Sequence, residues 1–201
     1  IFHDSNKKLS IQLGDGNLLS QLTKKIVVYN FRQNDLKNGG QGAPLTPIFH
    51  QKIKGSLKEN LWPVLFLNIG GISNVTSTSK LPVIFKNNNN LDSTNNVFAC
   101  DIAPGNCLID EWIRKNSNYN YDKDGLIAKS GKVNELILNQ ALDNFSGENN
   151  APFPLPSLDI KDFDISFARG LSLEDGCSTI TNFTAYLIAK GIEYSNKDKS
   201  K

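Results

Sequence analysis

The chain has 201 residues, of which 39% are hydrophobic, so it can form one or two domains with a real core and lies outside the disordered class. Its formal net charge is only +2, from 22 basic and 20 acidic side chains. We therefore expect neither nucleic acid nor an anionic membrane as a partner. No apolar run approaches the ~18 residues of a membrane-spanning helix.

The first sixty residues predict short elements around a glycine-rich loop. Residues 14–17 form a turn signal, and the leucines after them predict a short helix. The β-branched residues 26–29 predict a strand. Residues 39–44 (GGQGAP) form a loop whose glycines permit close approach to a ligand. A soft domain boundary falls between residues 51 and 61.

The middle of the chain predicts a hairpin. Residues 64–69 and 72–76 have strand character and flank Gly70-Gly71, and two strands joined by such a pair are typical of a β-hairpin. Glycine at this point also allows backbone N–H groups to approach phosphate oxygens, with Ser73 and Asn74 as added donors. The alternative is a plain turn. A further strand is expected at residues 81–86, before an asparagine run at 87–90.

Asp101 follows the apolar residues 97–100 and precedes a Pro104-Gly105 turn and a helical pattern at 107–115. A carboxylate at the end of a buried strand, with a turn and a helix start behind it, is where α/β enzymes place a catalytic base. The alternative is that Asp101 only caps the helix. Asn106 is also a favourable N-cap residue for that helix.

The last part of the chain predicts helices around residues 133–145 and 180–188, with an extended proline-rich connector at 152–156. Helices interleave with strands, so we expect an α/β fold. Cys100, Cys107 and Cys177 show no metal-ligand spacing, and their odd number argues against a disulfide framework. They are interpreted as reduced core residues of a cytoplasmic protein. The sequence contains no Met, and we expect it to be a piece of a longer protein.

Taken in order, these runs resemble the anhydro-N-acetylmuramic acid kinases of the acetate kinase, sugar kinase, heat-shock protein and actin superfamily. The resemblance covers nearly the whole chain, and its late part is similar to the alpha-proteobacterial version of the family. The motifs that carry it are residues 12–16 (QLGDG), 31–32 (FR), Asp35, 39–45 (GGQGAPL), 67–74 (LNIGGISN), 101 and 104–106 (D, PGN), 110–112 (DEW), 121–125 (YDKDG) and 130–133 (SGKV).

The resemblance implies a ribonuclease H-like actin and sugar-kinase fold that is incomplete. Residues 1–55 would be the C-terminal part of the first lobe and residues 61–193 the N-terminal part of the second, followed by a polar tail at 194–201. The family's N-terminal Ser/Thr-Gly phosphate loop and its C-terminal adenosine loop have no counterpart in the sequence.

The resemblance also implies an activity. The family uses ATP and Mg²⁺ to hydrolyse the anhydro ring of 1,6-anhydro-N-acetylmuramic acid and to phosphorylate O6, which gives N-acetylmuramic acid 6-phosphate in cell-wall recycling. No protein metal ligand is assigned, and whether the protein is a homodimer stays open. The implied roles are catalytic base for Asp101; supporting loop for Pro104, Gly105 and Asn106; ATP phosphate binding for Gly70, Gly71, Ser73 and Asn74; and sugar binding for Arg32, Asp35, Gln41 and Gly42.

Departures from the family pattern keep two other interpretations open. Asn30 replaces the usual Asp before Phe-Arg, Ile102-Ala103 replaces Thr-Gly, and Leu155-Pro156 replaces Pro-Lys. Beside an active kinase, the first of these interpretations is a catalytically dead remnant that at most binds sugar. The second is an interaction module that reuses the fold. For Arg32 and Asp35 the alternative is a surface ion pair of little energetic weight.

Overall fold

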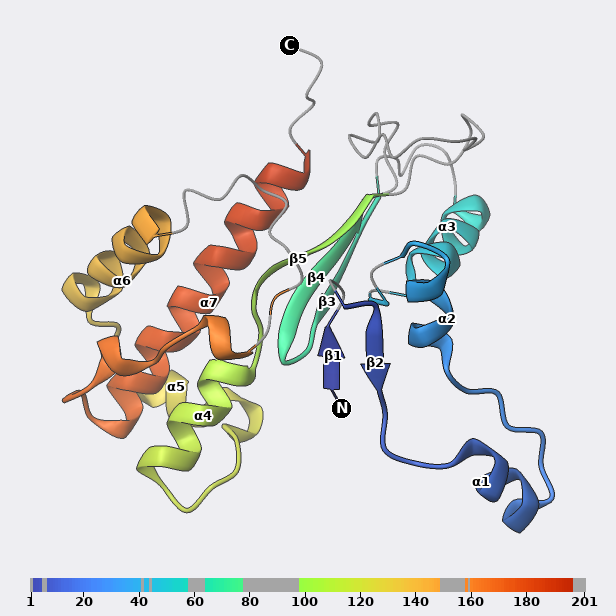
Figure 1. Ribbon diagram of the computed structural model, residues 1–201. Helices are drawn as coiled ribbons and strands as arrows, with labels where there is room; N and C mark the ends of the chain where they lie inside the picture. The colour runs from blue at the N-terminus through green and yellow to red at the C-terminus, as the bar shows by residue number, and fades with distance from the viewer. Residues whose placement is uncertain are drawn as a thin grey trace. The chain divides into compact units, whose positions relative to one another are not determined.

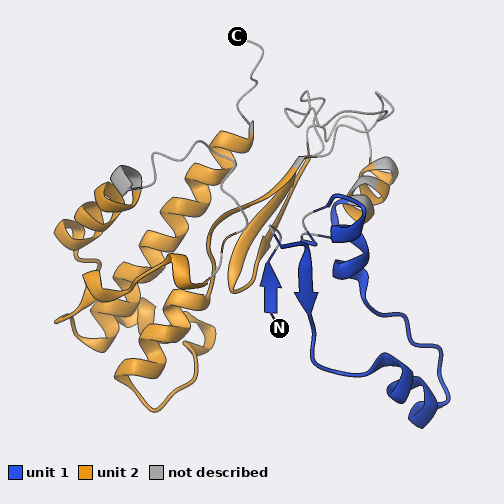
Figure 2. Cartoon of the chain, in the orientation of Figure 1, with its two compact units in different colours: residues 1–48 blue, residues 49–201 orange. Residues whose placement is uncertain are grey.

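The computed structural model describes residues 2–4, 7–40, 42–43, 45–57, 64–77, 98–148, 158 and 160–196. The chain divides into two compact units, Ile1–Ile48 and Phe49–Lys201 (Figure 2). The strand expected at residues 81–86, the asparagine run and the proline-rich connector lie outside the described residues. Among the described residues, no helix is both long enough and apolar enough to cross a membrane.

The first unit opens with a two-stranded ribbon. Strand β1 (Phe2–Asp4) pairs antiparallel with β2 (Leu9–Ile11), so that His3 lies directly opposite Ser10. The predicted short helix follows as α1 (Gly16–Thr23). The Oδ1 atom of Asp15 accepts the backbone N–H groups of Asn17 and Leu18 at 2.9 and 3.1 Å. These bonds satisfy two donors that the first helical turn leaves unpaired, which fixes where α1 begins.

The strand predicted at residues 26–29 is absent, so that prediction is wrong. Ile26 is 95% exposed and Val28 is 69% exposed. Strand preference of β-branched residues expresses packing on a pleated surface, and a strand needs a neighbour for its hydrogen bonds. In the described residues the β1–β2 ribbon is the first unit's sheet, and it does not include this segment.

Helix α2 (Phe31–Lys37) follows Asn30, which has a left-handed backbone with φ of 64° and makes no side-chain cap bond. Asparagine is one of the residues that tolerate this region best. Leu36 on α2 is fully buried. Helix α3 (Pro47–Ser56) then begins at the end of the first unit and continues into the second.

The second unit contains a three-stranded antiparallel sheet in the order β3-β4-β5, formed by Leu65–Ile69, Ile72–Ser77 and Phe98–Pro104. Strands β3 and β4 form the hairpin predicted around Gly70-Gly71, with Ile69 opposite Ser73. Neither glycine has the left-handed backbone of a primed hairpin turn. A Cβ atom would make only ordinary contacts at Gly70 and would meet open space at Gly71, so this turn does not require glycine for a positive φ.

The predicted helices of the second unit are confirmed, and the last one is much longer than its pattern indicated. The long helices are α4 (Cys107–Asn116), α6 (Glu135–Glu148) and α7 (Leu173–Asn196), with short helices α5 (Leu126–Ser130), Lys123–Gly125, Ile160–Asp162 and Ser166–Ala168. Figure 1 shows α7 running beside β5, with α6 along its other side. The mixture of helices and sheet agrees with the α/β class.

Glycine positions on α7 fix how closely it approaches its neighbours. A Cβ atom on Gly191 would lie 2.5 Å from the Cβ atom of Ile102, and one on Gly176 would collide with the indole of Trp112. Ile102 is 1% exposed and belongs to the apolar core. The departure from the family pattern at this position is therefore an apolar contact with α7. The indole N–H of Trp112 donates to the Leu173 carbonyl at 2.9 Å.

A candidate active site on the polar face of the sheet

The sheet of the second unit has one face that packs on the apolar core and an opposite face that carries a row of polar side chains beside Phe66. Val75, Cys100 and Ile102 belong to the core that packs against α7. Side chains alternate between faces along a strand, so Asn74 and Asp101 lie on the opposite face. The side chain of Asp101 therefore lies outside the apolar core, on the face of the sheet opposite to α7.

Asp101 lies in a row of polar residues across all three strands. Asn68 on β3 is opposite Asn74 on β4, and Asn74 is opposite Asp101 on β5. Directly opposed residues on antiparallel strands have neighbouring side chains. A shift of register between Ser73 and Asn74 makes Ser73 pair with Ala103, which leaves Ile102 as the extra residue. Such bulges often re-aim a side chain beside an active site.

The carboxylate of Asp101 has a defined partner. Its Oδ2 atom accepts the backbone N–H of Leu158 at 3.0 Å. A sequence-distant loop segment therefore holds the carboxylate in place. Asp101 lies within β5, three residues before its end at Pro104, so the prediction that it ends the strand is wrong. Pairing with β4 continues through Ala103 and Pro104 because residues 72–73 offer partners there.

The N-terminal end of α4 shows that Asp101 is not the residue that caps this helix, which was the alternative to a catalytic role. Asn106, and not Asp101, occupies the N-cap position, and its side chain makes no capping hydrogen bond. The backbone that leads into α4 is held instead by the hairpin turn. The Gly70 carbonyl accepts the Asn106 N–H at 2.7 Å, and the Gly71 carbonyl accepts those of Gly105 and Cys107 at 2.9 and 3.3 Å. Of the donors in the first turn of α4, the Cys107 N–H is thus satisfied by backbone, and the N-cap residue is Asn106 rather than Asp101.

The turn and the supporting loop are in close contact. A Cβ atom on Gly105 would collide with the Gly70 carbonyl, so glycine is required there. The buried hydroxyl of Ser73 donates to the Pro104 carbonyl at 3.1 Å, which commits its hydrogen to this loop. Gly71, in contrast, has open space where a Cβ atom would be. The structure therefore brings residues 70–74 and 101–106 together in one site.

The residues expected to bind the sugar belong to the first unit, where Asp35 organises the glycine-rich loop. Its Oδ2 atom accepts the Gly42 N–H at 2.8 Å, and its carbonyl accepts the Gly40 N–H at 2.9 Å. Gly42 has a φ of 74°, which favours glycine. Arg32 and Asp35 form no ion pair with each other, although the structure describes both. The ion-pair alternative is therefore wrong, whereas Gln41 lies outside the described residues.

The two histidines differ in how their nitrogens are satisfied. His50 of α3 is hydrogen-bonded through Nδ1 to the Thr76 hydroxyl at 2.9 Å and stacks on Phe66 with 4.5 Å between ring centroids. It is thus a structural histidine. The isolation of His3 and His50 in the sequence predicts a satisfied structural histidine at both positions, and for His50 this is confirmed. Both ring nitrogens of His3 are buried and have no hydrogen-bond partner in the part of the chain that the structure describes. For His3 the prediction of a satisfied histidine is therefore wrong. The sequence did not single out Asn68, which only the strand register places beside Asn74.

The cysteines are buried, free thiols, as expected of reduced core residues. Burial, and secondarily the neighbouring Asp101 carboxylate, raises the pKa of Cys100 to about 12. Burial and then Asp122 raise the pKa of Cys177 to about 12. A thiol that keeps its proton is a poor nucleophile. We therefore assign Cys100 to packing, despite its place next to Asp101.

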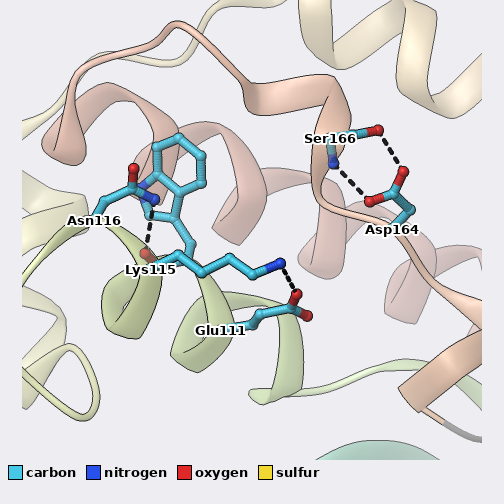
Figure 3. A network of polar contacts seen from close by, with 6 residues as sticks. Glu111, Lys115, Asn116, Asp164 and Ser166 are labelled. Carbon is cyan, nitrogen blue, oxygen red and sulfur yellow. Dashed lines mark hydrogen bonds and ion pairs between the residues drawn. The ribbon is translucent and has the colours of Figure 1, made fainter.

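Other acidic residues have structural partners. Asp122 accepts the N–H groups of Ile127 and Ala128 at 2.8 and 2.9 Å, which anchors the start of α5. Figure 3 shows Lys115 paired with Glu111 at 2.6 Å and Ser166 donating to Asp164. The Ser166 hydrogen bonds lower the pKa of Asp164. Within the described parts of the chain, no three His, Cys, Asp or Glu side chains gather as a metal site.

Comparison with known proteins shows which protein family the chain belongs to. The sequence profile of anhydro-N-acetylmuramic acid kinases matches residues 1–201. The chain belongs to the anhydro-N-acetylmuramic acid kinase family. This establishes the resemblance on which the site residues were expected, and it implies a sugar-kinase fold for the mixed helix and sheet structure.

Curated relatives show how much of such a protein the chain represents. A Pelagibacter ubique anhydro-N-acetylmuramic acid kinase is 50% identical over 202 residues, which is 100% of this chain but 50% of the relative. The Zymomonas mobilis protein of the same name is 36% identical over 94% of the chain and 47% of its own length. That of Acidiphilium cryptum is 35% identical over 94% and 48%, respectively. The chain spans about half the length of these relatives.

Proposed function

We propose that the chain is part of an ATP-dependent kinase that opens 1,6-anhydro-N-acetylmuramic acid and phosphorylates it to N-acetylmuramic acid 6-phosphate. Membership of the family supports the reaction. The polar face around Asp101 supports the place of the chemistry, because it joins a held carboxylate to a glycine turn. In this proposal residues 1–55 belong to the first kinase lobe, residues 61–193 to the second, and 194–201 to a polar tail.

The observation that carries the proposal is the hydrogen bond between Asp101 and the Leu158 N–H at 3.0 Å. It fixes one carboxylate oxygen. A general base must be positioned before its pKa matters, since proton transfer requires hydrogen-bond reach to the attacking group. Asn74, directly opposite Asp101, is one of the proposed phosphate-binding residues, so the proposed base and the ATP phosphates would be neighbours.

The proposed reaction begins when Asp101 takes a proton from water. The water oxygen bonds to C1 of the sugar, and the bond between C1 and O6 breaks. The freed O6 then bonds to the γ-phosphorus of ATP as the bond to ADP breaks. Asp101 thus handles one proton, and the rest of the chain's contribution is positioning, which accounts for most of the catalysis in phosphoryl transfer.

Two groups of loop residues are proposed to contact the two substrates. Gly70 and Gly71, with Asn74 and the buried Ser73, are proposed to line the ATP phosphates. A phosphate can approach Gly71 because no atom lies within 4 Å of where its Cβ would be. Arg32, Asp35, Gln41 and Gly42 are proposed to bind the sugar. Asp35 would act partly through the Gly39–Gly42 loop that it holds.

Magnesium is the expected companion of ATP, and the donors present fit a nucleotide-borne ion. Mg²⁺ usually takes one or two carboxylates together with substrate phosphates and water. The described residues hold no three-ligand acidic cluster, so we propose that the phosphates of ATP and water hold the ion. When bound, the ion neutralises charge on the transferred phosphoryl group.

The test is product formation by the complete protein that the gene carrying this sequence encodes. It should be incubated with 1,6-anhydro-N-acetylmuramic acid, ATP and Mg²⁺, and the products analysed by mass spectrometry. We expect equimolar ADP and N-acetylmuramic acid 6-phosphate. Sugar binding without either product would instead support the catalytically dead remnant. Binding of neither substrate would favour the interaction module.

A further inference from the structure

Two facing residues of the first unit carry buried polar atoms that have no partner. His3 on β1 is directly opposite Ser10 on β2. Both ring nitrogens of His3 and the hydroxyl oxygen of Ser10 are buried and make no hydrogen bond with the residues that the structure describes. Because opposed residues of an antiparallel pair project to the same face, these three unpartnered atoms belong to one small region of the β1–β2 ribbon.

The energetics make such a group unusual. Leaving a buried donor or acceptor without a partner costs about 1–3 kcal/mol, and most buried polar groups in proteins are paired. The rest of the ribbon follows this rule: the Ser10 N–H donates to Gln33 Oε1 at 2.9 Å, and Gln33 Nε2 donates to the Lys8 carbonyl at 3.0 Å. Unpaired atoms among well-paired neighbours are the kind of group that a bound molecule can satisfy.

This region borders the loop that the proposed function assigns to the sugar. A Cβ atom on Gly42 would lie 2.8 Å from Cε1 of His3, the ring carbon between the two nitrogens. Gly42 is itself held by the Asp35 carboxylate at 2.8 Å. The Arg32 carbonyl is 3.5 Å from the same Cβ position. His3 therefore lies against the loop on which three of the expected sugar-binding residues converge.

We propose that His3 and Ser10 form a further part of the amino-sugar site, a role that rests on the proposed function. A neutral imidazole offers one donor and one acceptor, and a serine hydroxyl offers both. Together they complement a ligand group that also donates and accepts, such as the hydroxyl or acetamido groups of an N-acetylated sugar. The chemistry suits neutral sugar groups. The nucleotide phosphates are assigned to residues of the second unit.

The test pairs two variants that remove the polar atoms and keep the shape. His3→Phe retains a ring against Gly42, and Ser10→Ala retains the β-carbon. Because each replaces an unpaired buried group by an apolar one, we expect the melting temperature without ligand to be unchanged or higher. By calorimetry on the complete protein, the Kd for 1,6-anhydro-N-acetylmuramic acid should rise about tenfold in His3→Phe and about threefold in Ser10→Ala. The Kd for ATP should not change.

His50→Phe is the matched control, because His50 is already paired with Thr76. We expect it to lower the melting temperature and to leave the Kd for the sugar unchanged. Unchanged sugar affinity in both His3→Phe and Ser10→Ala overturns the inference, as does a fall in melting temperature for His3→Phe like that of His50→Phe.

The outcomes separate this inference from the proposed function. If the unaltered protein binds and phosphorylates the sugar but the variants bind it equally well, only the role of His3 and Ser10 fails. If it binds the sugar without phosphorylating it, the kinase proposal fails, and weakened binding in the variants still supports the site. If it binds no sugar, both fail.

Discussion

The backbone N–H of Asn106 donates to the carbonyl oxygen of Gly70 at 2.7 Å, which ties the first turn of α4 to the β3–β4 hairpin. Two motifs more than thirty residues apart in the sequence thus form one backbone junction. The junction lies next to Asp101 on β5, so its geometry controls where the carboxylate and the proposed phosphate turn lie relative to each other.

Gly105→Ala should disrupt this junction. The added Cβ would collide with the Gly70 carbonyl, and backbone on both sides leaves little room for adjustment, so we expect a loss of about 1–3 kcal/mol in the free energy of unfolding. Urea denaturation measures it. Gly71→Ala is the control: its Cβ meets no atom within 4 Å, so its stability should stay within about 0.5 kcal/mol of the parent. Equal stability of the two variants would contradict the junction.

Asp101→Asn should abolish phosphorylation and leave ATP binding intact. The amide keeps an oxygen for the Leu158 N–H, but it cannot take a proton from water. Loss of a general base lowers kcat by about 10²–10⁴-fold. Turnover of the complete protein and its Kd for ATP are the measurements. Asp110→Asn, on the first turn of α4, is the control and should retain normal turnover. Near-normal turnover of Asp101→Asn would refute its role as the base.

Arg32→Gln tests the sugar-binding proposal on the first unit. Arg32 forms no ion pair with Asp35, its neighbour on α2, so its loss should change the free energy of unfolding by less than about 0.5 kcal/mol. The KM for the sugar should rise at least about tenfold, since hydrogen bonds from a charged group contribute about 1.5–3 kcal/mol. Steady-state kinetics with each substrate varied will show this. A rise confined to the KM for ATP would place Arg32 on the other side of the reaction.

The buried thiols predict how stability depends on alkaline pH. The ordinary pKa of 9.0 is raised to about 12 for Cys100 and for Cys177. Between these values the unfolded chain releases protons that the native chain keeps, so the free energy of unfolding falls as pH rises from about 9 to 12. Below pH 9 both states hold the protons and these thiols contribute no slope. Urea denaturation between pH 8 and 10.5 should show a flatter dependence in a C100A/C177A variant than in the parent.

The 201-residue chain on its own should self-associate. Leu13, Leu22 and Ile26 of the first unit are 93%, 73% and 95% exposed, and large exposed apolar areas promote association. Light scattering should show oligomers at micromolar concentration, and Leu22→Glu should reduce them. A monodisperse monomer with one cooperative thermal transition would contradict this prediction.

Local signals in the sequence determined several elements correctly. Asp15 before α1, the Gly70-Gly71 pair between two apolar runs, and the helical spacing behind Asn106 act over a few residues, so their consequences are visible in the chain itself. The family motifs likewise identified the kinase family, because a motif is a pattern of residue types that the sequence itself contains. The run at residues 26–29 shows the limit: its composition favours a strand, but a strand exists only where a neighbouring strand accepts its hydrogen bonds.

Only the tertiary structure decided how the site is assembled. The register of β3, β4 and β5 places Asn68, Asn74 and Asp101 in one row, and a single-residue change of register would turn such side chains to the other face. The partner of Asp101 is the distant Leu158, and the unpaired nitrogens of His3 are defined by burial opposite Ser10. Pairing, burial and hydrogen-bond satisfaction depend on which segments meet. The sequence therefore indicates which residues belong to the candidate site, and the packing of the chain determines what each of them contacts.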